Sequence, residues 1–427
     1  MIGANEKAAA PGLDRGDSVS KRPHLVFIVT SPKFWSFFKG QIAYLSRAGF
    51  KVTCISGPGP EASAILAEGG DFIAVPMERE ISLLKDTVSL WRLWRVLRKL
   101  RPDVTNVGTP KAGLLGGIAA RIAGVPHRIY TLHGLRLETT SGLKRSFLIA
   151  MERFACNNAH HVRCVGRHLL DRAVALGVTR ARKSYVLGAG SANGIPTESL
   201  RHCPTRVKEA EELKRELGIP ASAPVIGFVG RFTRDKGIAD LYNAFLKVRK
   251  SFPDVRLILL GEFEEGDPVD IDVRQTMKSD SGVIFAGVVT DTPRYYAAMD
   301  VVALPSYREG FPNVPLEAQA ASVPVVTTRV TGALESVVDR VTGLLVPAGD
   351  VEALSAALES LLEDQDYRQR LGRAGAIWVQ EHFREEIVWN AMVNDYESML
   401  GKSVRSSSVA TLVAASPGVM STNGQTD

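Results

Sequence analysis

A chain of 427 residues with 45% hydrophobic content is long enough to form two or three domains, each with its own core. It has no uninterrupted apolar run of about 18 residues, and Met1 to Arg22 lacks the apolar centre of a signal peptide. The four cysteines are unevenly spaced, which argues against a disulfide framework. We therefore expect a cytoplasmic protein without a transmembrane helix.

The two parts of the chain carry opposite net charge. Residues 1–200 contain 28 Lys and Arg against 14 Asp and Glu, whereas residues 201–427 contain 24 against 32. A basic first half indicates attraction to an anionic partner, such as a membrane surface, a pyrophosphate-bearing substrate or nucleic acid. The alternative is a basic face that is merely solvated.

The first half of the chain alternates apolar runs with helical patterns, after a polar stretch (residues 1–22) that predicts a disordered tail. Such alternation is typical of a parallel sheet with helices on both faces. Ser31 to Phe38 is expected to be a loop, and Lys39 to Ala48 a helix ended by a glycine. The expected strands are 24–30, 52–56, 72–75, 104–107, 128–132, 161–165 and 184–187.

A helix is also expected over Leu83 to Leu100, where apolar residues recur at helical spacing between basic ones. The favoured interpretation is that its apolar stripe covers the sheet. The alternative is an interfacial role, because basic residues beside Trp91 and Trp94 suit a lipid surface.

Two polar residues follow expected strands of the first half at positions that suggest a ligand. Lys111 falls in the first turn of a helix, where a cation opposes the helix dipole, so an anionic ligand would account for it. His133 stands at the carboxyl end of a strand, with Gly134 after it to allow close backbone approach. A structural histidine is the alternative for His133.

The second half repeats the α/β pattern. Residues 196–223 are charge-rich and contain three prolines, which predicts a linker with one short helix at 205–217. The expected strands are 225–229, 256–261, 283–285, 301–304, 323–327 and 343–346; the expected helices are 238–251, 351–363, 366–381 and 384–400. Residues 402–427 are rich in Ser, Thr, Ala and Gly and are predicted to be disordered.

The first strand of this half runs into a basic loop that begins at Gly230. Arg231 and Lys236 lie in the loop, and a helix follows Gly237. Both cations, together with the N–H groups of that helix, are suited to one diphosphate. The alternative is an ordinary basic surface loop.

Glu309 and Glu317 stand eight positions apart across a Gly-Phe-Pro turn, between an apolar strand and a further apolar run. The order strand, loop, helix and strand places Glu309 in the loop and Glu317 in the first turns of the helix. Such a strand end is where parallel α/β sheets bind substrates. The alternative is an exposed loop acid and a helix-stabilising acid.

These segments resemble the retaining, nucleotide-sugar-dependent glycosyltransferases of family 4. Glu309 and Glu317 match the family's Glu-x7-Glu signature, and Gly230 to Gly237 matches its Gly-Arg-x4-Lys-Gly segment. Segments of the first half resemble the branch that assembles capsule, O-antigen and exopolysaccharide: Thr109–Gly113, Thr131–Gly134 and Gly190–Pro196. The chain departs from the pattern in two places: Pro196 stands where an Asp is usual, and Gly261-Glu262 resembles the family's Gly-x-Gly segment but lacks its second Gly.

The resemblance implies the α/β architecture named GT-B, in which two Rossmann-like parallel-sheet domains face each other across a cleft. It places the acceptor domain at residues 23–196, a linker at 197–223 and the nucleotide-sugar domain at 224–383. A helix at 384–401 then crosses back to the first domain.

The resemblance also implies the reaction: transfer of a hexose or N-acetylhexosamine from a nucleotide-diphosphate sugar, most simply a UDP sugar, with retention of configuration. Arg231 and Lys236 would bind the diphosphate, Glu309 the donor sugar, Glu317 the ribose, and His133 the donor sugar or the transition state. The loop that meets the phosphates or the sugar would contain Phe311, Pro312 and Asn313, and Gly230 and Glu262 would line the nucleotide pocket. Because no second acid is placed as a nucleophile, we expect same-face attack with the diphosphate as base.

The acceptor is expected on the basic first domain, as a saccharide linked to a polyprenyl diphosphate at the cytoplasmic face of the inner membrane. Its candidate ligands are Lys39, Lys111, Arg136 and Lys144, beside the aromatic cluster Phe34, Trp35, Phe37 and Phe38. No cofactor and no metal is expected, because the sequence Asp270-Ile-Asp272 does not follow a strand and Cys156 to Cys164 lacks the tight cysteine pairs of zinc sites.

Two other functions remain as alternatives. A nucleotide-sugar 2-epimerase shares the two-domain architecture but lacks the Glu-x7-Glu segment. A non-enzymatic protein that binds an anionic surface would use the basic half, although no nucleic-acid-binding motif is present. The sugar, the nucleotide base, the acceptor and the oligomeric state stay open.

Overall fold

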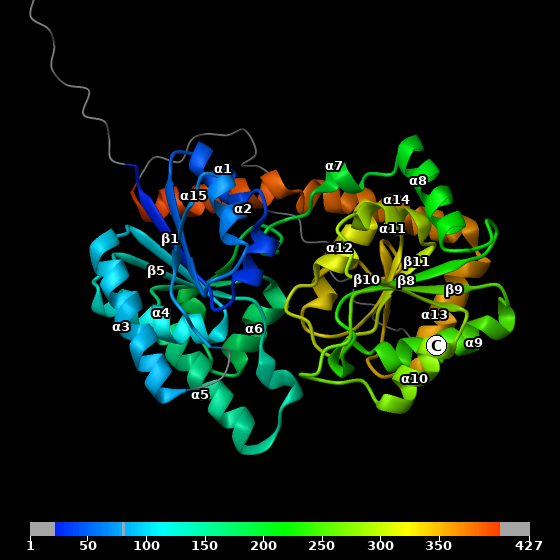
Figure 1. Ribbon diagram of the computed structural model, residues 1–427, viewed down its shortest axis with the longest axis horizontal. Helices are drawn as coiled ribbons and strands as arrows, with labels where there is room; N and C mark the ends of the chain where they lie inside the picture. The colour runs from blue at the N-terminus through cyan, green and yellow to red at the C-terminus, as the bar shows by residue number, and fades with distance from the viewer. Residues whose placement is uncertain (1–21, 79–81, 402–427) are drawn as a thin grey trace, which may run out of the picture.

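The structure, a computed structural model, describes residues 22–78 and 82–401, without the side chains of residues 36, 37, 83, 136 and 139. The tails predicted at 1–22 and 402–427 lie outside the described residues, Arg22 excepted. The chain forms two α/β lobes, which the colours of Figure 1 separate into an N-terminal and a C-terminal half. The prediction of two parallel-sheet domains is confirmed.

The sheet of the first lobe has seven strands, all parallel, in the order β3-β2-β1-β4-β5-β6-β7. The order reverses direction between β1 and β4, and ligands of such sheets bind at the carboxyl ends of the strands beside that point. The strands are β1 (His24–Ile28), β2 (Lys51–Ser56), β3 (Asp71–Ala74), β4 (Val104–Gly108), β5 (His127–Leu132), β6 (His161–Cys164) and β7 (Ser184–Val186).

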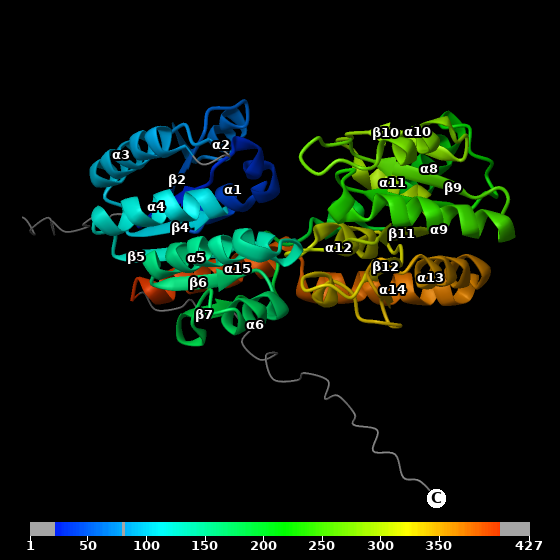
Figure 2. The ribbon, with the colours of Figure 1, turned by 90° about the horizontal axis from the view of Figure 1, so that it is seen from below.

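Helices cover both faces of this sheet. On one face α3, α4 and α5 lie side by side, with α4 in the middle (Figure 2). The other face packs against α1 and the last helix, α15 (Glu385–Met399). The helical elements are η1 (Pro32–Phe38), α1 (Gln41–Arg47), α2 (Ala62–Ala67), α3 (Leu83–Leu100), α4 (Pro110–Ile122), η2 (Arg136–Thr139), α5 (Gly142–Asn158), α6 (Arg167–Ala175) and η3 (Ala181–Lys183).

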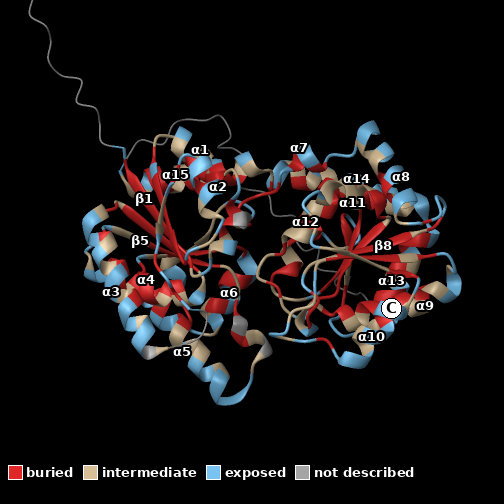
Figure 3. Ribbon diagram, in the orientation of Figure 1, coloured by how far each residue is buried: buried red, intermediate tan, exposed pale blue. Residues whose placement is uncertain are grey.

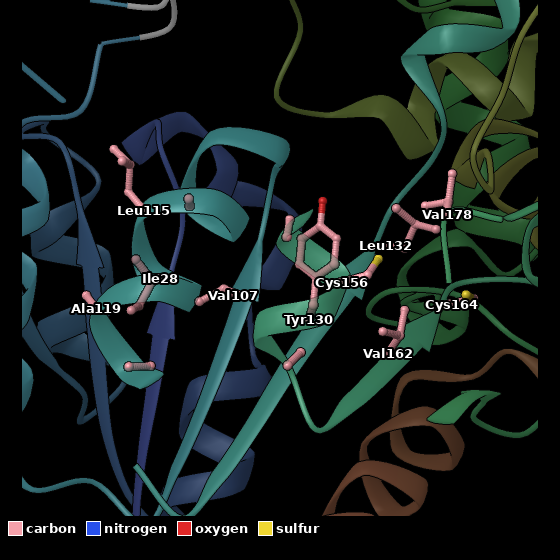
Figure 4. Close-up of a cluster of buried hydrophobic side chains, with 14 of the residues drawn as sticks. Ile28, Val107, Leu115, Ala119, Tyr130, Leu132, Cys156, Val162, Cys164 and Val178 are labelled. Carbon is pink, nitrogen blue, oxygen red and sulfur yellow. The ribbon is translucent and has the colours of Figure 1, made fainter. Parts of the chain in front are cut away.

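The core under α4 depends on a close helix-to-sheet contact (Figure 4). A Cβ atom at Gly113 would lie 2.4 Å from the Tyr130 ring, so α4 reaches this depth only because the position is a glycine. The buried Tyr130 hydroxyl donates to the Glu152 carboxylate of α5 over 2.8 Å. The sequence segment that we associated with a ligand therefore also serves packing.

The sheet of the second lobe has six parallel strands in the order β10-β9-β8-β11-β12-β13, with the reversal between β8 and β11. The strands are β8 (Val225–Val229), β9 (Arg256–Leu260), β10 (Val283–Gly287), β11 (Val301–Leu304), β12 (Val325–Thr328) and β13 (Gly343–Val346). The helical elements are η4 (Arg234–Lys236), α9 (Ile238–Ser251), α10 (Ile271–Ser279), α11 (Thr292–Ala298), α12 (Asn313–Ala320), η5 (Ala333–Glu335), α13 (Val351–Glu363) and α14 (Gln365–His382).

Three helices of this lobe begin at an aspartate that caps free N–H groups. Asp270 accepts from the second residue of α10 over 2.9 Å, Asp350 from the third residue of α13 over 2.9 Å, and Asp364 from the third residue of α14 over 2.8 Å. Each such cap is worth about 1 kcal/mol.

Two local expectations were wrong. The segment Ser31 to Phe38, expected as a loop, contains the 3-10 helix η1, which carries Trp35 and Phe38 into the core. In the predicted linker, the one helix expected at 205–217 is present as α8 (Pro204–Glu216), but a second helix, α7 (Thr197–Leu200), was not expected; α8 packs on α11 through Leu213 and Ala298. Its apolar side makes α8 a structural part of the second lobe rather than a free connection.

The chain passes between the lobes twice, and the two crossings lie together. Ile195 N–H donates to the Phe383 carbonyl over 2.7 Å, and Glu385 N–H donates back to the Ile195 carbonyl over 3.2 Å. Trp389 Nε1 donates to Asn193 Oδ1 over 2.8 Å. After the crossing, α15 lies on the first lobe, where it buries Tyr396 in the core.

Buried residues follow the strands and the inner faces of the helices, and exposed residues gather on the outer helix faces (Figure 3). Of α3, the side chains of Leu93 and Leu97 are buried, as the favoured interpretation expected, whereas Trp91 is half exposed. Among helices in the described part of the chain, none combines the length and apolar character needed to cross a bilayer.

Candidate active site between the lobes

The loops after β8 and β11 meet at the reversal of the second sheet. Gly237, at the end of the first loop, sits so close to the second that a Cβ atom there would lie 2.1 Å from the Pro305 carbonyl oxygen. Its φ of +67° also favours glycine. The two segments that the sequence singled out therefore form one packed surface.

Lys236 and Glu309 form an ion pair on this surface. The Lys236 Nζ lies 2.6 Å from Glu309 Oε1, and the Ser306 hydroxyl donates to the same oxygen over 2.7 Å. Only 8% of the Glu309 side chain and 17% of the Lys236 side chain are exposed. These two contacts hold the Glu309 carboxylate in one position, and the Lys236 ammonium lies directly beside it.

Arg231, in the same loop as Lys236, is exposed and lies beside two acids. Its Nη1 lies 2.8 Å from Glu264, and its Nη2 lies 3.9 Å from Asp235. Burial works to raise the pKa of Asp235. The Thr233 hydroxyl and the charges of Lys236, Arg231 and Arg308 outweigh that effect and hold the Asp235 pKa below its usual value. Asp235 thus stays ionised and orients two arginines.

Glu317 lies in α12, directly after this loop. The Tyr296 hydroxyl donates to its Oε2 over 2.8 Å, and burial raises the pKa of the Glu317 carboxyl. Pro312 and Asn313 begin α12, so free N–H groups of the helix face the loop. Phe311 reaches the other lobe, where a Cβ atom added at Gly166 or Gly190 would approach its ring within 3.0 Å.

His133 of the first lobe lies directly against this loop. A Cβ atom at Gly310 would stand 1.7 Å from the His133 carbonyl oxygen. The imidazole packs edge-on against the rings of Phe34 and Phe38, with centroids 5.0 Å and 6.3 Å away. Burial, assisted by the charge of Arg163, lowers the His133 pKa to about 4, so its ring is neutral at physiological pH.

A second contact between the lobes holds this arrangement. Glu335 of the second lobe accepts hydrogen bonds from the backbone N–H groups of Arg167 and His168, over 2.5 Å and 2.6 Å, at the start of α6 in the first lobe. Thr331 also donates to Glu138 over 2.8 Å. Glu335 therefore caps a helix of the opposite lobe, a role that the sequence did not reveal because the capped residues lie 168 and 167 positions away in the chain.

The four acceptor candidates are not brought together in the structure. Lys111 pairs with Asp86 of α3 over 2.7 Å, so a protein carboxylate accounts for the cation that we had assigned to an anionic ligand. Lys39 is exposed after η1, and Lys144 is exposed on α5. The side chain of Arg136 lies outside the described set.

Of the aromatic cluster, Phe34 and Phe38 surround His133, and Trp35 is buried with its Nε1 donating to Ser56 over 3.2 Å. The side chain of Phe37 lies outside the described set. These rings therefore shape the pocket of the histidine instead of forming an open surface for a lipid tail.

The remaining candidates from the sequence are Glu262, Gly230 and the two cysteines, Cys156 and Cys164. Glu262 is exposed, and its carbonyl accepts from Phe232 N–H over 2.8 Å. Gly230, before Arg231, adopts a φ of +149° and packs against Gly261. Cys156 and Cys164 are buried, and burial raises the pKa of both thiols. Within the described ranges, no three His, Cys, Asp or Glu residues are grouped so as to hold a metal ion.

Comparisons with known proteins agree with this geometry. Residues 209–378 match the family model "Glycosyl transferases group 1", and residues 35–186 match "Glycosyl transferase 4-like domain". The chain is 34% identical, over 90% of its length and 99% of the relative's, to the capsular polysaccharide biosynthesis glycosyltransferase CapM of Staphylococcus aureus.

A second relative is the Escherichia coli UDP-Gal:alpha-D-GlcNAc-diphosphoundecaprenol alpha-1,3-galactosyltransferase, 28% identical over 69% of this chain and 75% of that protein. The fold is similar to that of Anabaena HepE in complex with UDP and glucose, with a TM-score of 0.73 and 21% identity over 88% of this chain and 99% of that one. Sucrose-phosphate synthase of Thermosynechococcus elongatus gives the same TM-score and identity over 90% of this chain and all of that one.

The second lobe thus places a cation and an acid where its strand order reverses, against a histidine of the first lobe. The two halves of the chain match glycosyltransferase models, and a relative acts in capsule synthesis. The protein belongs to the family 4 glycosyltransferases of the GT-B fold and is a glycosyltransferase of cell-surface polysaccharide synthesis.

Proposed function

We propose that this enzyme transfers a hexose or N-acetylhexosamine from a UDP sugar to a saccharide linked to a polyprenyl diphosphate, with retention of configuration. The observation that carries the proposal is the Lys236 to Glu309 pair, which the next residue, Gly310, brings against His133 of the opposite lobe. One relative is named for a UDP sugar donor and a diphosphoundecaprenol acceptor.

The residues have distinct roles in the proposed transfer. Lys236 and Arg231 stabilise the charge that builds on the departing diphosphate, and the N–H groups at the start of α12 add donors. Glu309 binds sugar hydroxyls, and Glu317 the ribose. Neutral His133 offers a hydrogen bond without adding charge.

Two cations can neutralise the diphosphate without a metal ion, and we propose that transfer proceeds in that way. Asp270 supports this proposal, because its carboxylate caps α10 and is occupied there. Transfer in the presence of a chelator is expected to equal transfer in added Mg²⁺. A rate restored only by the divalent ion would contradict the proposal.

We attribute the retained configuration to attack on the same face of the donor sugar from which the diphosphate leaves. A diphosphate oxygen takes the proton of the acceptor hydroxyl. The acceptor hydroxyl oxygen then bonds to the anomeric carbon as the carbon–oxygen bond to the diphosphate breaks. Mass spectrometry of the enzyme during turnover is expected to show no covalent glycosyl adduct. A trapped adduct would replace this mechanism with a two-step one.

The main experiment combines thermal-shift screening of UDP, GDP and dTDP sugars with transfer to a synthetic lipid-diphosphate saccharide. Glu309→Ala is expected to keep nucleotide binding and lose turnover, because in the proposed roles Glu309 binds the sugar while Arg231 and Lys236 bind the diphosphate. Arg231→Ala is expected to weaken both. An epimer formed from donor alone would favour the epimerase, and salt-sensitive DNA binding without nucleotide binding would favour a non-enzymatic protein.

We further propose that the enzyme works at the cytoplasmic face of the inner membrane and docks through α3 and α5. Large apolar side chains project from both helices: 83% of Leu84 and 51% of Trp91 are exposed on α3, and 91% of Leu143 and 51% of Phe147 on α5. The two helices lie on one face of the sheet (Figure 2).

The exposed basic residues of this face indicate what kind of partner it binds. Exposed basic residues accompany the apolar ones on both helices: Lys85, Arg92, Arg95, Arg98 and Lys99 on α3, and Lys144 on α5. Arg95 also lies over the Trp91 ring at 4.8 Å. Because each such cation is worth about 1 kcal/mol near an anionic leaflet, the mixed face suits an anionic bilayer.

Sedimentation with vesicles tests this surface. Wild-type protein is expected to bind phosphatidylglycerol vesicles and not pure phosphatidylcholine. The double change Leu143→Ser and Phe147→Ser is expected to weaken binding roughly tenfold, because apolar insertion is lost. Ile377→Ser, at a residue 60% exposed in the second lobe, is the matched control. Equal binding by all three proteins would contradict the assigned face.

A further inference from the structure

A line of buried polar side chains runs beneath His133 from the sheet to the last helix. Thr131 on β5 donates to Asn106 on β4 over 2.7 Å. Asn106 donates to the Tyr396 hydroxyl of α15 over 3.2 Å, and Arg163 on β6 donates to the same hydroxyl over 3.3 Å. The strand that ends at His133 is thereby tied to α15.

Arg163 forms the charged centre of this line. Its Nη2 lies 2.5 Å from Asp395 Oδ2, its side chain is only 5% exposed, and its guanidinium stands over the Tyr396 ring at 5.1 Å. The Tyr185 hydroxyl donates to Asp395 over 2.8 Å. A buried ion pair costs much in lost hydration, and well-packed apolar residues hold elements together at least as well. Fastening α15 alone therefore does not explain an arginine here.

A small cavity connects this charge to the active site. It offers about 20 Å³ to a water-sized sphere and is lined by His133, Arg163, Asn106 and Thr131 among others. Arg163 Nε is buried and has no hydrogen-bond partner among the described residues. The volume admits one water molecule, and the polar lining supplies the two to four partners that such a water needs.

We propose that Arg163 and Asp395 are positioning residues for glycosyl transfer. The buried pair, with a water in the cavity, holds the neutral His133 ring at the sugar, so that the docking of α15 sets the geometry of the reacting centre. The inference rests on the proposed function. A displacement of about 1 Å at a reacting centre costs on the order of a hundredfold in rate, which gives the pair a measurable effect.

Asp395→Asn tests the proposal by removing the counter-charge while it keeps the shape of the side chain. Turnover at saturating donor is expected to fall roughly tenfold to a hundredfold, with UDP affinity unchanged, because the nucleotide site lies in the other lobe. Should this variant fail to fold, Tyr185→Phe, which removes one donor to Asp395, is expected to show the same pattern at smaller amplitude.

The second lobe offers a matched control. Asp280 accepts from Arg249 over 2.7 Å and from the Tyr242 hydroxyl over 3.0 Å, the same combination of partners far from the cleft. Asp280→Asn is expected to lower the melting temperature without reducing turnover measured below it. An equal loss of turnover in both variants would overturn the proposal, since the effect would then reflect stability alone.

A double-mutant cycle with His133→Ala supplies the decisive result. If the pair acts through His133, adding Asp395→Asn to His133→Ala lowers turnover no further. Losses that multiply would show that the pair does not act through the histidine, and would overturn the proposal. A wild-type protein that neither transfers nor hydrolyses any nucleotide sugar would instead overturn the proposed function, so the two failures are distinguishable.

Discussion

The two sides of the cleft handle charge in opposite ways. On the second lobe, Arg231 and Lys236 are both paired with acids before any ligand is present, Glu264 with the first and Glu309 with the second. On the first lobe, His133 is neutral and packs against two phenylalanine rings, and the buried Arg163, whose charge acts on it, is paired with Asp395 of α15.

The two sides of the site are therefore arranged differently before a ligand binds. In the proposed function the donor side exchanges protein carboxylates for a diphosphate, so we expect ligand binding there to compete with internal ion pairs. The histidine side needs no exchange of ions, because its groups are already desolvated and fixed. Four substitutions test this contrast. In order of decreasing expected effect, they separate the two sides, remove a cation of the donor side, weaken the contact between the lobes and release Arg231 from an acid.

Gly310→Ala is expected to have the largest effect, because it keeps the two sides apart. The new methyl group would stand 1.7 Å from the His133 carbonyl oxygen, which the closed lobes cannot accommodate. Steady-state kinetics are expected to show kcat/KM lowered at least about a hundredfold. Gly266→Ala, where a Cβ meets open space, is the control. A nearly normal rate would mean that transfer does not require this contact.

Lys236→Gln empties the donor side of its buried cation. Loss of one charge-stabilising donor typically costs about a hundredfold to a thousandfold in kcat, and the same range is expected at saturating donor. Lys247→Gln breaks an exposed pair with Glu352, 2.7 Å long, and serves as control. If kcat is kept and only KM rises, Lys236 binds substrate without stabilising the departing diphosphate.

Glu335→Ala loosens the contact between the sides. It removes the cap on α6, and a cap worth about 1 kcal/mol shifts the balance of open and closed molecules about fivefold, so turnover is expected to fall by at most that factor. Small-angle X-ray scattering is expected to show a more extended molecule. An unchanged scattering profile together with normal turnover would show that closure does not rely on this cap.

Glu264→Gln frees the exposed cation of the donor side and should have the smallest effect. Arg231 would no longer be shared with Glu264, and an exposed pair is worth about 0.2–1 kcal/mol, so UDP affinity is expected to rise up to about fivefold. Isothermal titration measures the change. Glu265→Gln, at a side chain 87% exposed and paired with Arg274, is the control. Weaker binding by Glu264→Gln would mean that this acid assists the nucleotide.

The sequence predicted the parts that depend on neighbouring residues. Buried parallel strands read as apolar runs, and every strand of both sheets was placed near its observed bounds. The donor motifs were recognised because each occupies one loop, with Lys236 and Glu309 on adjacent strand ends.

Contacts between distant segments could not be predicted in this way. The partner of Arg163 lies 232 residues along the chain, and nothing in the local pattern points to it. The acceptor candidates stay a prediction, but the ion pair of Lys111 with Asp86 could not be foreseen, because helix packing sets the pairing of a lysine.

The position of α15 has a consequence for synthesis on the ribosome. The first lobe emerges early, yet Val388, Met392 and Tyr396, which fill one side of its core, are translated only after the second lobe. The early lobe therefore waits with an uncovered apolar face until the whole second lobe has been made. A chain stopped before α15 would lack Asp395 and Tyr396, the partners of Arg163, and with them the support that we propose for His133.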